Sequence, residues 1–390
     1  NARAEFQTHF KLYIMKKINF FLLILLCLMS CRTDEIIVRP EVEEGLATPE
    51  NTAIKGFYLL NEGNMGSNKA TLDFFDYTTG TYHRNIYADI NPDVVKELGD
   101  VGNDIKIYGS KMYAVINVSN KIEVLDAKTA RRIKTINLEN CRYVTFKDGK
   151  VYASSYAGPV VLNPNAPLGK VAEIDTVSLT IKREVVVGYQ PEEMQIIGNN
   201  LYIANSGGYR FPNYDRTVSV VDLNTFTETK KIDVAINLHH IAKDDDGDLY
   251  VSSRGDYYNV PSSLFLVDAA TGTVKKDFKI AVSEMTIVNG KLYYYGNEFN
   301  YNTHAYTKSF GIIDVKTEQI ISNKIIDQQY VDAIKTPYGI AVNPITEDIY
   351  MTDARNYVST GFVYCFDKNG KFKWKTEGGN IPAHFVFLYK

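Results

Sequence analysis

The chain has 390 residues, a formal net charge of −3 and a pI of about 6.1. Nucleic-acid-binding proteins usually carry a basic stripe on their surface. The slight negative charge of this chain does not indicate one, so we expect no nucleic-acid partner. Aromatic residues make up 12% of the chain, and the 28 tyrosines among them favour β structure. The chain is longer than a single core usually allows, which favours repeated units that pack only on their neighbours.

Residues 1–30 are predicted to be upstream residues followed by a lipoprotein signal peptide. Met15 is the expected start, and two lysines and an apolar run over residues 20–29 follow it. This run is too short for an ordinary membrane span. It ends in Leu-Met-Ser-Cys, which resembles a bacterial lipobox, so Cys31 is the expected site of lipidation. A plain secretory signal with a chance cysteine is the alternative.

Residues 31–53 are predicted to form the lipid anchor and a flexible tether. The acidic pair Asp34-Glu35, close behind the cysteine, resembles the surface-export signal of Bacteroidetes lipoproteins. Two prolines and several glutamates follow up to residue 52, as expected of a linker. We therefore expect a protein anchored in outer-membrane lipid through Cys31 and facing the cell exterior.

One short pattern recurs along the rest of the chain: a polar residue, an apolar residue and a tyrosine at the start of a strand. Gly56-Phe57-Tyr58 is a looser copy, and six closer copies follow it. These are Lys111-Met112-Tyr113, Lys150-Val151-Tyr152, Asn200-Leu201-Tyr202, Asp248-Leu249-Tyr250, Lys291-Leu292-Tyr293 and Asp348-Ile349-Tyr350. Such internal repeats indicate a solenoid, a propeller or another repeat fold.

A second pattern, two apolar residues followed by an aspartate, occurs once in each repeat, with a glutamate in one first position. The aspartates are Asp76, Asp126, Asp175, Asp222, Asp268, Asp314 and Asp367. Neighbouring copies are 46 to 53 residues apart, which is an even period. Each carboxylate is predicted to accept backbone N–H bonds in the turn after a strand, rather than to act in catalysis.

Each repeat divides into four short strands without helical periodicity between them. In the repeat around residue 200, strands are expected near 194–198, 201–204, 217–222 and 228–234. Four antiparallel strands per repeat are typical of a propeller blade. We therefore predict an all-β fold over residues 54–390, a seven-bladed β-propeller of four-stranded antiparallel blades.

The two ends of this domain are expected to meet in one blade. The N-terminal repeat lacks its first strand, and His384–Lys390 forms a strand of that type with no partner after it. The C-terminal strand therefore joins the N-terminal blade and closes the ring without an open edge.

Two of the four cysteines lie inside the predicted propeller. Cys141 and Cys365 fall in blades that are not adjacent, so both are predicted to be small buried residues without a disulfide. Cys27 leaves with the signal peptide. No Cys-x-x-Cys pair or Cys/His cluster with metal spacing occurs, and we expect no metal and no cofactor.

Long loops between the second and third strands are expected on one face of the propeller, and tight turns on the other. The loops are rich in Tyr, Asn, Gly and Arg, which supply rigid contact area and adaptable hydrogen bonds at binding surfaces. The funnel that they surround is the predicted ligand site, unless the loops simply face solvent. The predicted contacts are Asn61, Asn64, Asn117, Tyr156, Tyr209, Arg210, Tyr214, His240, Arg254, Tyr257, Tyr258, Phe299, Tyr301, Tyr338, Arg355 and Tyr357.

Candidate catalytic or metal-binding groups are few. The histidine pair at 239–240 could ligate a metal, but without carboxylate or cysteine partners at a fixed spacing it is predicted to be a polar rim. The acidic run 244–248 resembles a calcium loop, lacks the downstream glutamate of one, and is predicted to be a hairpin turn. Glu192, Glu193 and Glu284 precede inner strands and could do acid–base work if the fold brings them together.

The repeat around residue 200 also carries a family resemblance. Leu201–Gly207 followed by Thr217–Asp222 resembles the YVTN-type repeat of YncE-like seven-bladed propellers. With the lipobox and the acidic cluster, residues 56–390 resemble Bacteroidetes surface lipoproteins of DUF5074 type. BtuG-type members of that group bind cobalamin (vitamin B12) and pass it to a TonB-dependent outer-membrane transporter. The resemblance implies the same function here, with cobalamin as a transported ligand rather than a cofactor.

Three functions are therefore open. The favoured one is non-catalytic capture of cobalamin or another large polar ligand beside a transporter, and the second is a protein- or glycan-interaction module. The third is a propeller lyase or lactonase, which needs acids or histidines that converge on the axis. The blade links offer Asp104, Glu192, His240, Glu284 and His384. Two or three such groups within about 4–6 Å, with shifted pKa values, would favour an enzyme.

Overall fold

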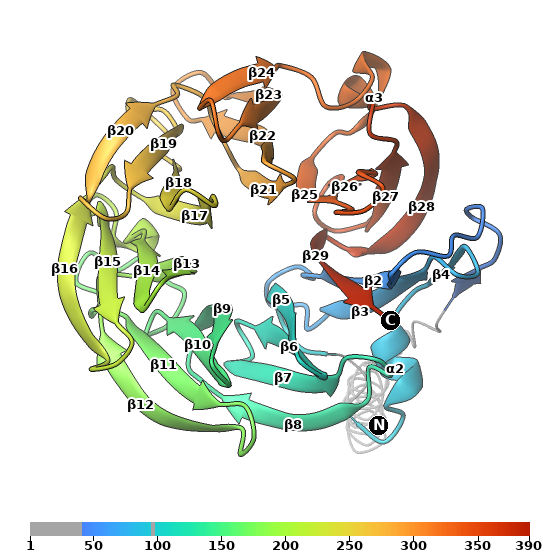
Figure 1. Cartoon of the computed structure of the whole chain (residues 1–390), viewed down its shortest axis with the longest axis horizontal. Coiled ribbons are helices and arrows are strands. Elements are labelled where there is room, and N and C mark those ends of the chain that lie inside the picture. Colours follow the sequence, from blue (N-terminus) through green and yellow to red (C-terminus); the bar gives the residue numbers. More distant parts are fainter. Residues whose placement is uncertain (1–40, 95–97) are drawn as a thin grey trace, which may run out of the picture. The chain divides into compact units, whose positions relative to one another are not determined.

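The computed structural model describes residues 41–94 and 98–390. Within these ranges, seven antiparallel sheets stand around one axis like the blades of a propeller (Figure 1). The predicted all-β, seven-bladed propeller is confirmed. The predicted signal peptide and the lipidation site Cys31 lie outside the described residues.

The first blade combines the two ends of the domain. It contains β1 (Val42–Glu43), β2 (Ile54–Asn61), β3 (Thr71–Asp76), β4 (Thr81–His83) and β29 (Pro382–Tyr389). The second blade contains β5 (Gly102–Tyr108), β6 (Lys111–Ile116), β7 (Lys121–Asp126) and β8 (Arg132–Asn137). The third contains β9 (Cys141–Lys147), β10 (Lys150–Ser155), β11 (Lys170–Asp175) and β12 (Thr180–Val186).

The remaining four blades follow in chain order. The fourth and fifth contain β13 (Pro191–Ile197), β14 (Asn200–Asn205), β15 (Thr217–Asp222) and β16 (Thr227–Asp233), then β17 (Leu238–Lys243), β18 (Asp248–Ser253), β19 (Ser263–Asp268) and β20 (Thr273–Asp277). The last two contain β21 (Glu284–Val288), β22 (Lys291–Asn300), β23 (Ala305–Asp314) and β24 (Gln319–Ser322), then β25 (Pro337–Val342), β26 (Ile349–Asp353), β27 (Thr360–Phe366) and β28 (Phe372–Asn380).

Short helical segments lie in the connections between strands. The helices are α2 (Ile86–Ile90) and α3 (Gln328–Ala333), in links between blades, and the 3-10 turn η1 (Gly208–Arg210), in a loop. No helix in the described part of the chain is long and apolar enough to cross a membrane.

The ring is closed by pairing between the two ends of the domain. β29 runs antiparallel to β2, with Tyr389 opposite Ile54 and Pro382 opposite Asn61. β29 thus supplies the inner strand that the N-terminal blade lacks, as the repeat pattern predicted. With β3 on one side and β29 on the other, β2 has no unpaired edge at the junction.

The first blade has an additional outer strand in a stretch that the sequence predicted to be a flexible tether. Val42 pairs with His83 of β4, and the backbone N–H of Glu50 donates to the carbonyl of Tyr77 at 2.7 Å. Without this segment β4 would be the edge strand of its sheet, and the segment pairs with backbone groups on that edge. The chain therefore contacts the propeller from residue 41 onward, before the expected boundary at residue 54.

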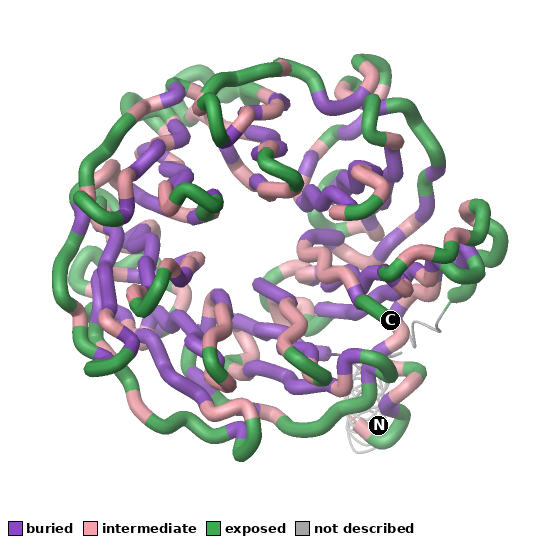
Figure 2. The backbone as a smooth tube through the Cα atoms, viewed as in Figure 1, coloured by how far each residue is buried: buried purple, intermediate pink, exposed green. Residues whose placement is uncertain are grey.

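Apolar side chains pack between neighbouring blades rather than in one central core. The described residues contain seven such clusters, one for each blade-to-blade interface. Figure 2 shows the buried residues inside the blades and exposed residues along the outer strands and turns. Each cluster is built from the facing sheets of two neighbouring blades, so the apolar core is divided around the ring.

The recurring tyrosine connects each of several blades to the next. The Tyr58 hydroxyl donates to the carbonyl of Ala127 at 2.9 Å, and the Tyr202 hydroxyl donates to that of Ala269 at 3.2 Å. Both acceptors directly follow the repeat aspartate of the neighbouring blade. The two sequence patterns therefore meet across blade interfaces, which explains why they recur together.

The repeat aspartates accept backbone N–H bonds in their turns, as predicted. The Asp222 carboxylate, for example, accepts from the N–H groups of Asn224 at 3.0 Å and Thr225 at 2.8 Å. The Thr225 N–H lowers the pKa of the Asp222 carboxyl. Equivalent bonds reach Asp76, Asp126, Asp175, Asp268, Asp314 and Asp367. Their role is local structure.

The structure also bears out two smaller predictions. Cys141 of the third blade and Cys365 of the seventh are buried and not joined in a disulfide. In the acidic run 244–248, the Asp244 carboxylate accepts from the N–H groups of Asp246 and Asp248, which makes the run a hairpin turn.

Deleting residues 382–390 should abolish cooperative folding, because β2 then loses its inner partner along its whole length. We expect no sharp thermal transition by circular dichroism. Deletion of residues 1–52 is the matched control: it removes β1, which pairs through two residues only, and should leave a cooperative transition. A chain without β29 that melts as the full chain does would show that closure is dispensable.

Candidate ligand-binding site

Pairs of consecutive residues interrupt the inner strands of most blades close to the axis. In β9, Arg142 and Tyr143 together face the single Ser154 of β10, because the register shifts between Ala153 and Ser155. Similar shifts occur in β5, β13, β17, β25 and β29. Such a β-bulge redirects the side chains of the pair, and bulges are frequent beside functional sites for that reason.

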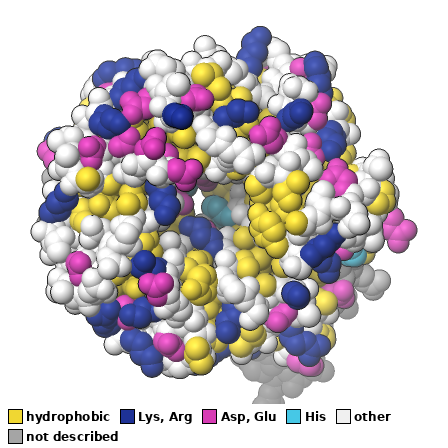
Figure 3. Space-filling model, viewed as in Figure 1, with side chains coloured by type: hydrophobic (Ala, Val, Ile, Leu, Met, Phe, Trp, Pro, Cys, Tyr) yellow, Lys and Arg dark blue, Asp and Glu magenta, His cyan; other side chains and the backbone are white. Residues whose placement is uncertain are grey.

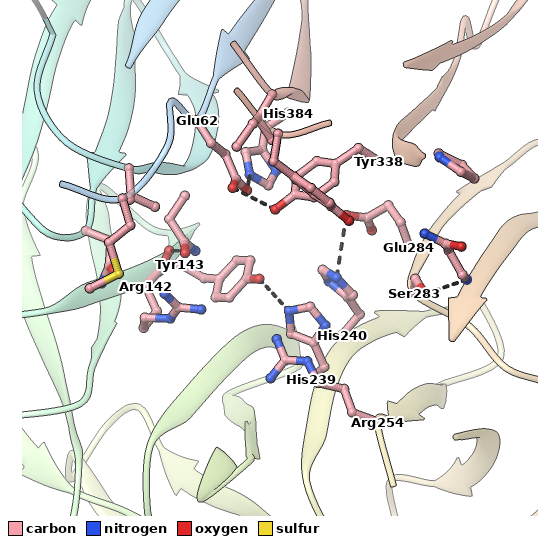
Figure 4. Close-up of a pocket in the computed structure, with 18 of the residues that line it drawn as sticks. Glu62, Arg142, Tyr143, His239, His240, Arg254, Ser283, Glu284, Tyr338 and His384 are labelled. Carbon is pink, nitrogen blue, oxygen red and sulfur yellow. Dashed lines mark hydrogen bonds and ion pairs between the residues drawn. The ribbon is translucent and has the colours of Figure 1, made fainter. Parts of the chain in front are cut away.

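The redirected side chains line a channel along the axis (Figure 4). Its larger cavity, of about 500 Å³, lies at the end of the second-to-third strand connections, and a smaller one, of about 350 Å³, lies towards the hairpin turns. Tyr143, His240, Glu284 and His384 line both cavities, and we call these four residues the waist. In Figure 3 the ring is hollowed at its centre, where a histidine and a basic side chain are visible.

Each blade contributes to the larger cavity through its second-to-third strand connection or, in the sixth blade, through the end of β22 that leads into it. The contributing residues in the described chain are Gly63, Met65, Asn117, Val118, Val160, Tyr209, Arg254, Tyr257, Ser262, Asn297, Glu298, Phe299 and Tyr357. Aromatic side chains therefore stand around the mouth, while charged and polar groups from the bulges lie deeper.

Half of the residues predicted from sequence as ligand contacts line this cavity. These are Asn117, Tyr209, His240, Arg254, Tyr257, Phe299, Tyr338 and Tyr357. The other predicted residues, Asn61, Asn64, Tyr156, Arg210, Tyr214, Tyr258, Tyr301 and Arg355, are not among its lining residues.

The predicted residues that do not line the cavity are engaged elsewhere, and for two of them burial is the reason. Asn61 is fully buried, and its side chain donates to Thr71 and accepts from the backbone of Gly379. Tyr156 is buried too, and the Arg142 guanidinium lies over its ring at 4.8 Å. Both act as support for the site rather than as its surface.

The other six lie on the rim of the loops and contact their neighbours. Arg210 lies over the ring of Tyr189, Arg355 over that of Phe362, and Tyr258 stacks on Tyr301 with ring centroids 5.2 Å apart. Tyr214 packs against Phe211, and the Asn64 amide donates to the backbone of Tyr357. Loop composition alone could not separate side chains aimed at the axis from those that pack on the rim.

Several lining residues were outside the predicted contacts because they lie in the inner or second strands, or directly beside them, and not in the long loops. They are Glu62, Asn103, Arg142, Tyr143, His239, Ser283, Glu284, Tyr295 and His384. The signal available in the sequence was two successive polar residues directly before an apolar one, as in Arg142-Tyr143-Val144 and His239-His240-Ile241. That pattern breaks the alternation of a strand and marks the bulge.

Two arginines share one buried carboxylate on one side of the cavity. The Arg142 Nε donates to Glu192 at 3.0 Å, and Arg254 Nη1 donates to the other Glu192 oxygen at 3.2 Å. The Glu192 side chain has no exposed surface. Burial opposes its ionisation, but the two guanidiniums hold the pKa of its carboxyl below the usual range. Glu192 is therefore the counter-ion that permits two arginines on the axis.

A neutral histidine stands beside this pair. His239 Nε2 lies 2.9 Å from the hydroxyl of Tyr143. Burial and the charge of Arg254 lower the pKa of His239 well below its usual range. Burial also raises the pKa of Tyr143 well above its usual range. Both groups are therefore uncharged at neutral pH.

His240 forms an acid–base cluster at the waist. Its Nδ1 lies 2.9 Å from Glu193, and its Nε2 lies 3.5 Å from Glu284. Burial opposes protonation of the ring, but the two carboxylates raise the pKa of His240 above its usual range. Burial raises the pKa of Glu284, whereas bonding to His240 and the charge of Lys106 hold the pKa of Glu193 low against its own burial. The two carboxyl groups are thus unequal.

The first blade adds a third polar cluster. Glu62, which follows β2, accepts from the Tyr338 hydroxyl at 2.7 Å and lies 3.0 Å from His384 Nε2. Burial opposes protonation of His384, but Glu62 raises the pKa of its ring. In the part of the chain that the structure describes, no group of three or more His, Cys, Asp or Glu residues has the arrangement of a metal site.

The profile of a family described as a domain of unknown function, DUF5074, matches residues 55–388. This chain belongs to the DUF5074 family. No protein of curated function matches the sequence significantly.

Solved structures share the propeller fold of this DUF5074 protein. Hydrazine synthase of Kuenenia stuttgartiensis is 15% identical, with a TM-score of 0.53 over 69% of this chain and 77% of its own. The computationally designed protein Ika8 is 10% identical, with a TM-score of 0.53 over 89% and 97%. A candidate 6-phosphogluconolactonase from Bacteroides fragilis NCTC 9343 is 12% identical, with a TM-score of 0.57 over 87% and 100%. At these identities the likeness shows the fold alone.

Replacing Glu192 with Gln should destabilise the DUF5074 domain by about 3–5 kcal/mol at pH 7, because two partly buried guanidiniums lose their fully buried counter-ion. The lowered pKa means that the carboxylate contributes stability above the unfolded value of about 4.3, and that this contribution is lost as pH falls through the folded pKa. The difference between E192Q and the unaltered protein should therefore shrink below pH 4. Urea unfolding at several pH values measures it.

The exposed Glu139, in the link between β8 and β9, offers a control for this prediction, since E139Q also removes one carboxylate but leaves the contacts of the two arginines intact. It should unfold as the unaltered protein does at every pH. A constant gap between E192Q and the unaltered protein from pH 7 to pH 3 would contradict the assigned ionisation of Glu192.

Proposed function

We propose that this protein is a cell-surface binding lipoprotein that captures cobalamin and passes it to a TonB-dependent outer-membrane transporter. The observation that carries the proposal is the larger axial cavity, to which every blade contributes residues and whose mouth is aromatic. A cavity lined by apolar rings with a few placed polar groups is typical of small-molecule sites. Membership of the DUF5074 family and the resemblance to BtuG-type lipoproteins direct the choice of ligand.

Cobalamin suits the two levels of this site. A corrinoid is too large for about 500 Å³, so only part of it would enter the cavity. Its flat face would rest on the aromatic rim, which includes Tyr209, Tyr257, Phe299 and Tyr357. The amide groups on its edge would meet hydrogen-bonding partners deeper in the channel. In this proposal the protein holds the ligand without changing it, and a lipid on Cys31 keeps it beside the transporter.

Calorimetric titration of residues 36–390 with cyanocobalamin tests this proposal. We expect tight binding with one ligand per chain, and at least tenfold weaker binding for Y257A or F299A, because buried aromatic anchors dominate such interfaces. Y389A is the control, since Tyr389 is an exposed aromatic residue of β29 outside the cavity. No heat and no thermal stabilisation at saturating cyanocobalamin would reject cobalamin, and glycans and outer-membrane proteins would then be screened.

The cluster at His240 favours a propeller lyase or lactonase as a second candidate function. Two carboxyl groups with oppositely shifted pKa values contact the two nitrogens of one imidazole, an arrangement found where acid and base roles are divided. Aldonolactones and uronic-acid polymers injected into the same calorimeter would then give sustained heat of turnover. That heat should disappear in H240Q and persist in the control H83Q, whose histidine lies in β4.

A further inference from the structure

The side of the channel formed by the third, fourth and fifth blades carries one unbalanced positive charge. Arg142 and Arg254 both contact Glu192, so two guanidiniums share a single carboxylate. Each arginine is permanently charged, and Glu192 carries at most one negative charge. The cluster therefore has a net charge of about +1 inside a partly enclosed cavity, where charge is screened less than in water.

Most hydrogen-bond donors of these arginines remain unused. A guanidinium has five N–H groups, and Arg142 and Arg254 each give one nitrogen to Glu192. Among the described residues, neither guanidinium donates to any other protein group. Both side chains line the larger cavity, and 12% of that of Arg142 and 27% of that of Arg254 is exposed there. The remaining donors thus face the space in which a ligand would lie.

The two guanidiniums are held in place before any ligand arrives. Arg142 lies over the ring of Tyr156, whose hydroxyl in turn donates to Glu192. In Figure 4, Arg142, His239 and Arg254 lie on one side of the channel and Glu62 and Tyr338 on the other. An anion that binds beside Arg142 and Arg254 would exchange solvent for hydrogen-bond donors that are already in place. The free-energy cost of reorganising the site on binding would therefore be small.

The acidic groups of the same cavity do not neutralise this charge. Glu62 is bonded to Tyr338 and His384, Glu284 lies against His240, and Glu298 accepts from the backbone of Ser262. Each acid has its own partner on another part of the wall. The arginine pair is the part of the cavity that lacks a balancing charge.

We propose that Arg142 and Arg254 form a subsite for one oxyanion of the ligand, a carboxylate or a phosphate group. Arginine is suited to this task because its planar fork can give two parallel N–H bonds to such a group. The proposal rests on the proposed function in that the larger cavity is the ligand site. Cobalamin carries one phosphodiester. If cobalamin is the ligand, this group is the part that would contact Arg142 and Arg254, deepest in the cavity.

Anion titrations of the full propeller, residues 36–390, test the subsite directly. Inorganic phosphate and glucuronate represent the two sources of the oxyanion, and sodium chloride at the same ionic strength is the reference. We expect at least one of the two anions to bind, and R254Q to weaken that binding tenfold or more, as loss of charge-assisted hydrogen bonds does. The control R355Q removes a rim arginine outside the cavity and should bind as the unaltered protein does.

The remaining outcomes separate the subsite from the cobalamin proposal. If phosphate or glucuronate binds through Arg254 but cyanocobalamin does not bind, the subsite stands and the assigned ligand is wrong. If neither anion binds above the chloride reference, or if R254Q binds them as well as R355Q, the subsite is rejected. R254K keeps the charge but loses the fork, and should give intermediate binding. It serves as the test variant if R254Q does not show a cooperative unfolding transition.

Discussion

The antiparallel pairing of β29 with β2 is the contact on which the rest of the molecule depends. It joins the last strand of the chain to the first full strand and so turns seven sheets into a closed ring. The channel exists only because that ring is closed. The same pairing brings His384 against Glu62, residues 322 positions apart, and so completes one wall of the site.

Closure also brings charged and polar groups of the blades together around the larger cavity. Apolar side chains fill the spaces between blades, where sheet faces meet, and some of them also line the smaller cavity. The bulges then place charged groups where seven strands converge. Burying such groups is costly, and the cost is limited here by pairing each charge with a partner from a neighbouring blade. Glu192 with Arg142, and Glu193 with His240, both follow this rule.

Much of the fold could be predicted from sequence because it rests on local, repeated chemistry. The aspartate at the end of each third strand accepts N–H bonds from its own turn, and the sequence pattern predicted this role. The seven repeats, the closing strand and the unpaired state of Cys141 and Cys365 follow from the same regularity. The outer strand β1 was not predicted, because its stretch has the composition of a linker and pairs with β4 through only two residues.

The site was harder to predict because it depends on register. Tyr257, Tyr258 and Tyr301 are all tyrosines in long loops. Tyr258 and Tyr301 stack on each other, however, and of the three only Tyr257 lines the cavity. Arg142 and His239 lie in strands, where alternation alone assigns one side chain to each face. A bulge of one residue turns them towards the axis, and no pattern of loop composition reports that shift.

The central claim is that ligand is held at one end of the channel, by the second-to-third strand connections. Hydrogen–deuterium exchange with and without cyanocobalamin tests it most directly, since it reports the place of binding and not only its strength. Bound ligand should slow exchange in segments 62–66, 206–216, 254–262 and 297–304, with no change in the hairpin turns at the opposite end. Protection confined to those turns or to the outer strands would contradict it.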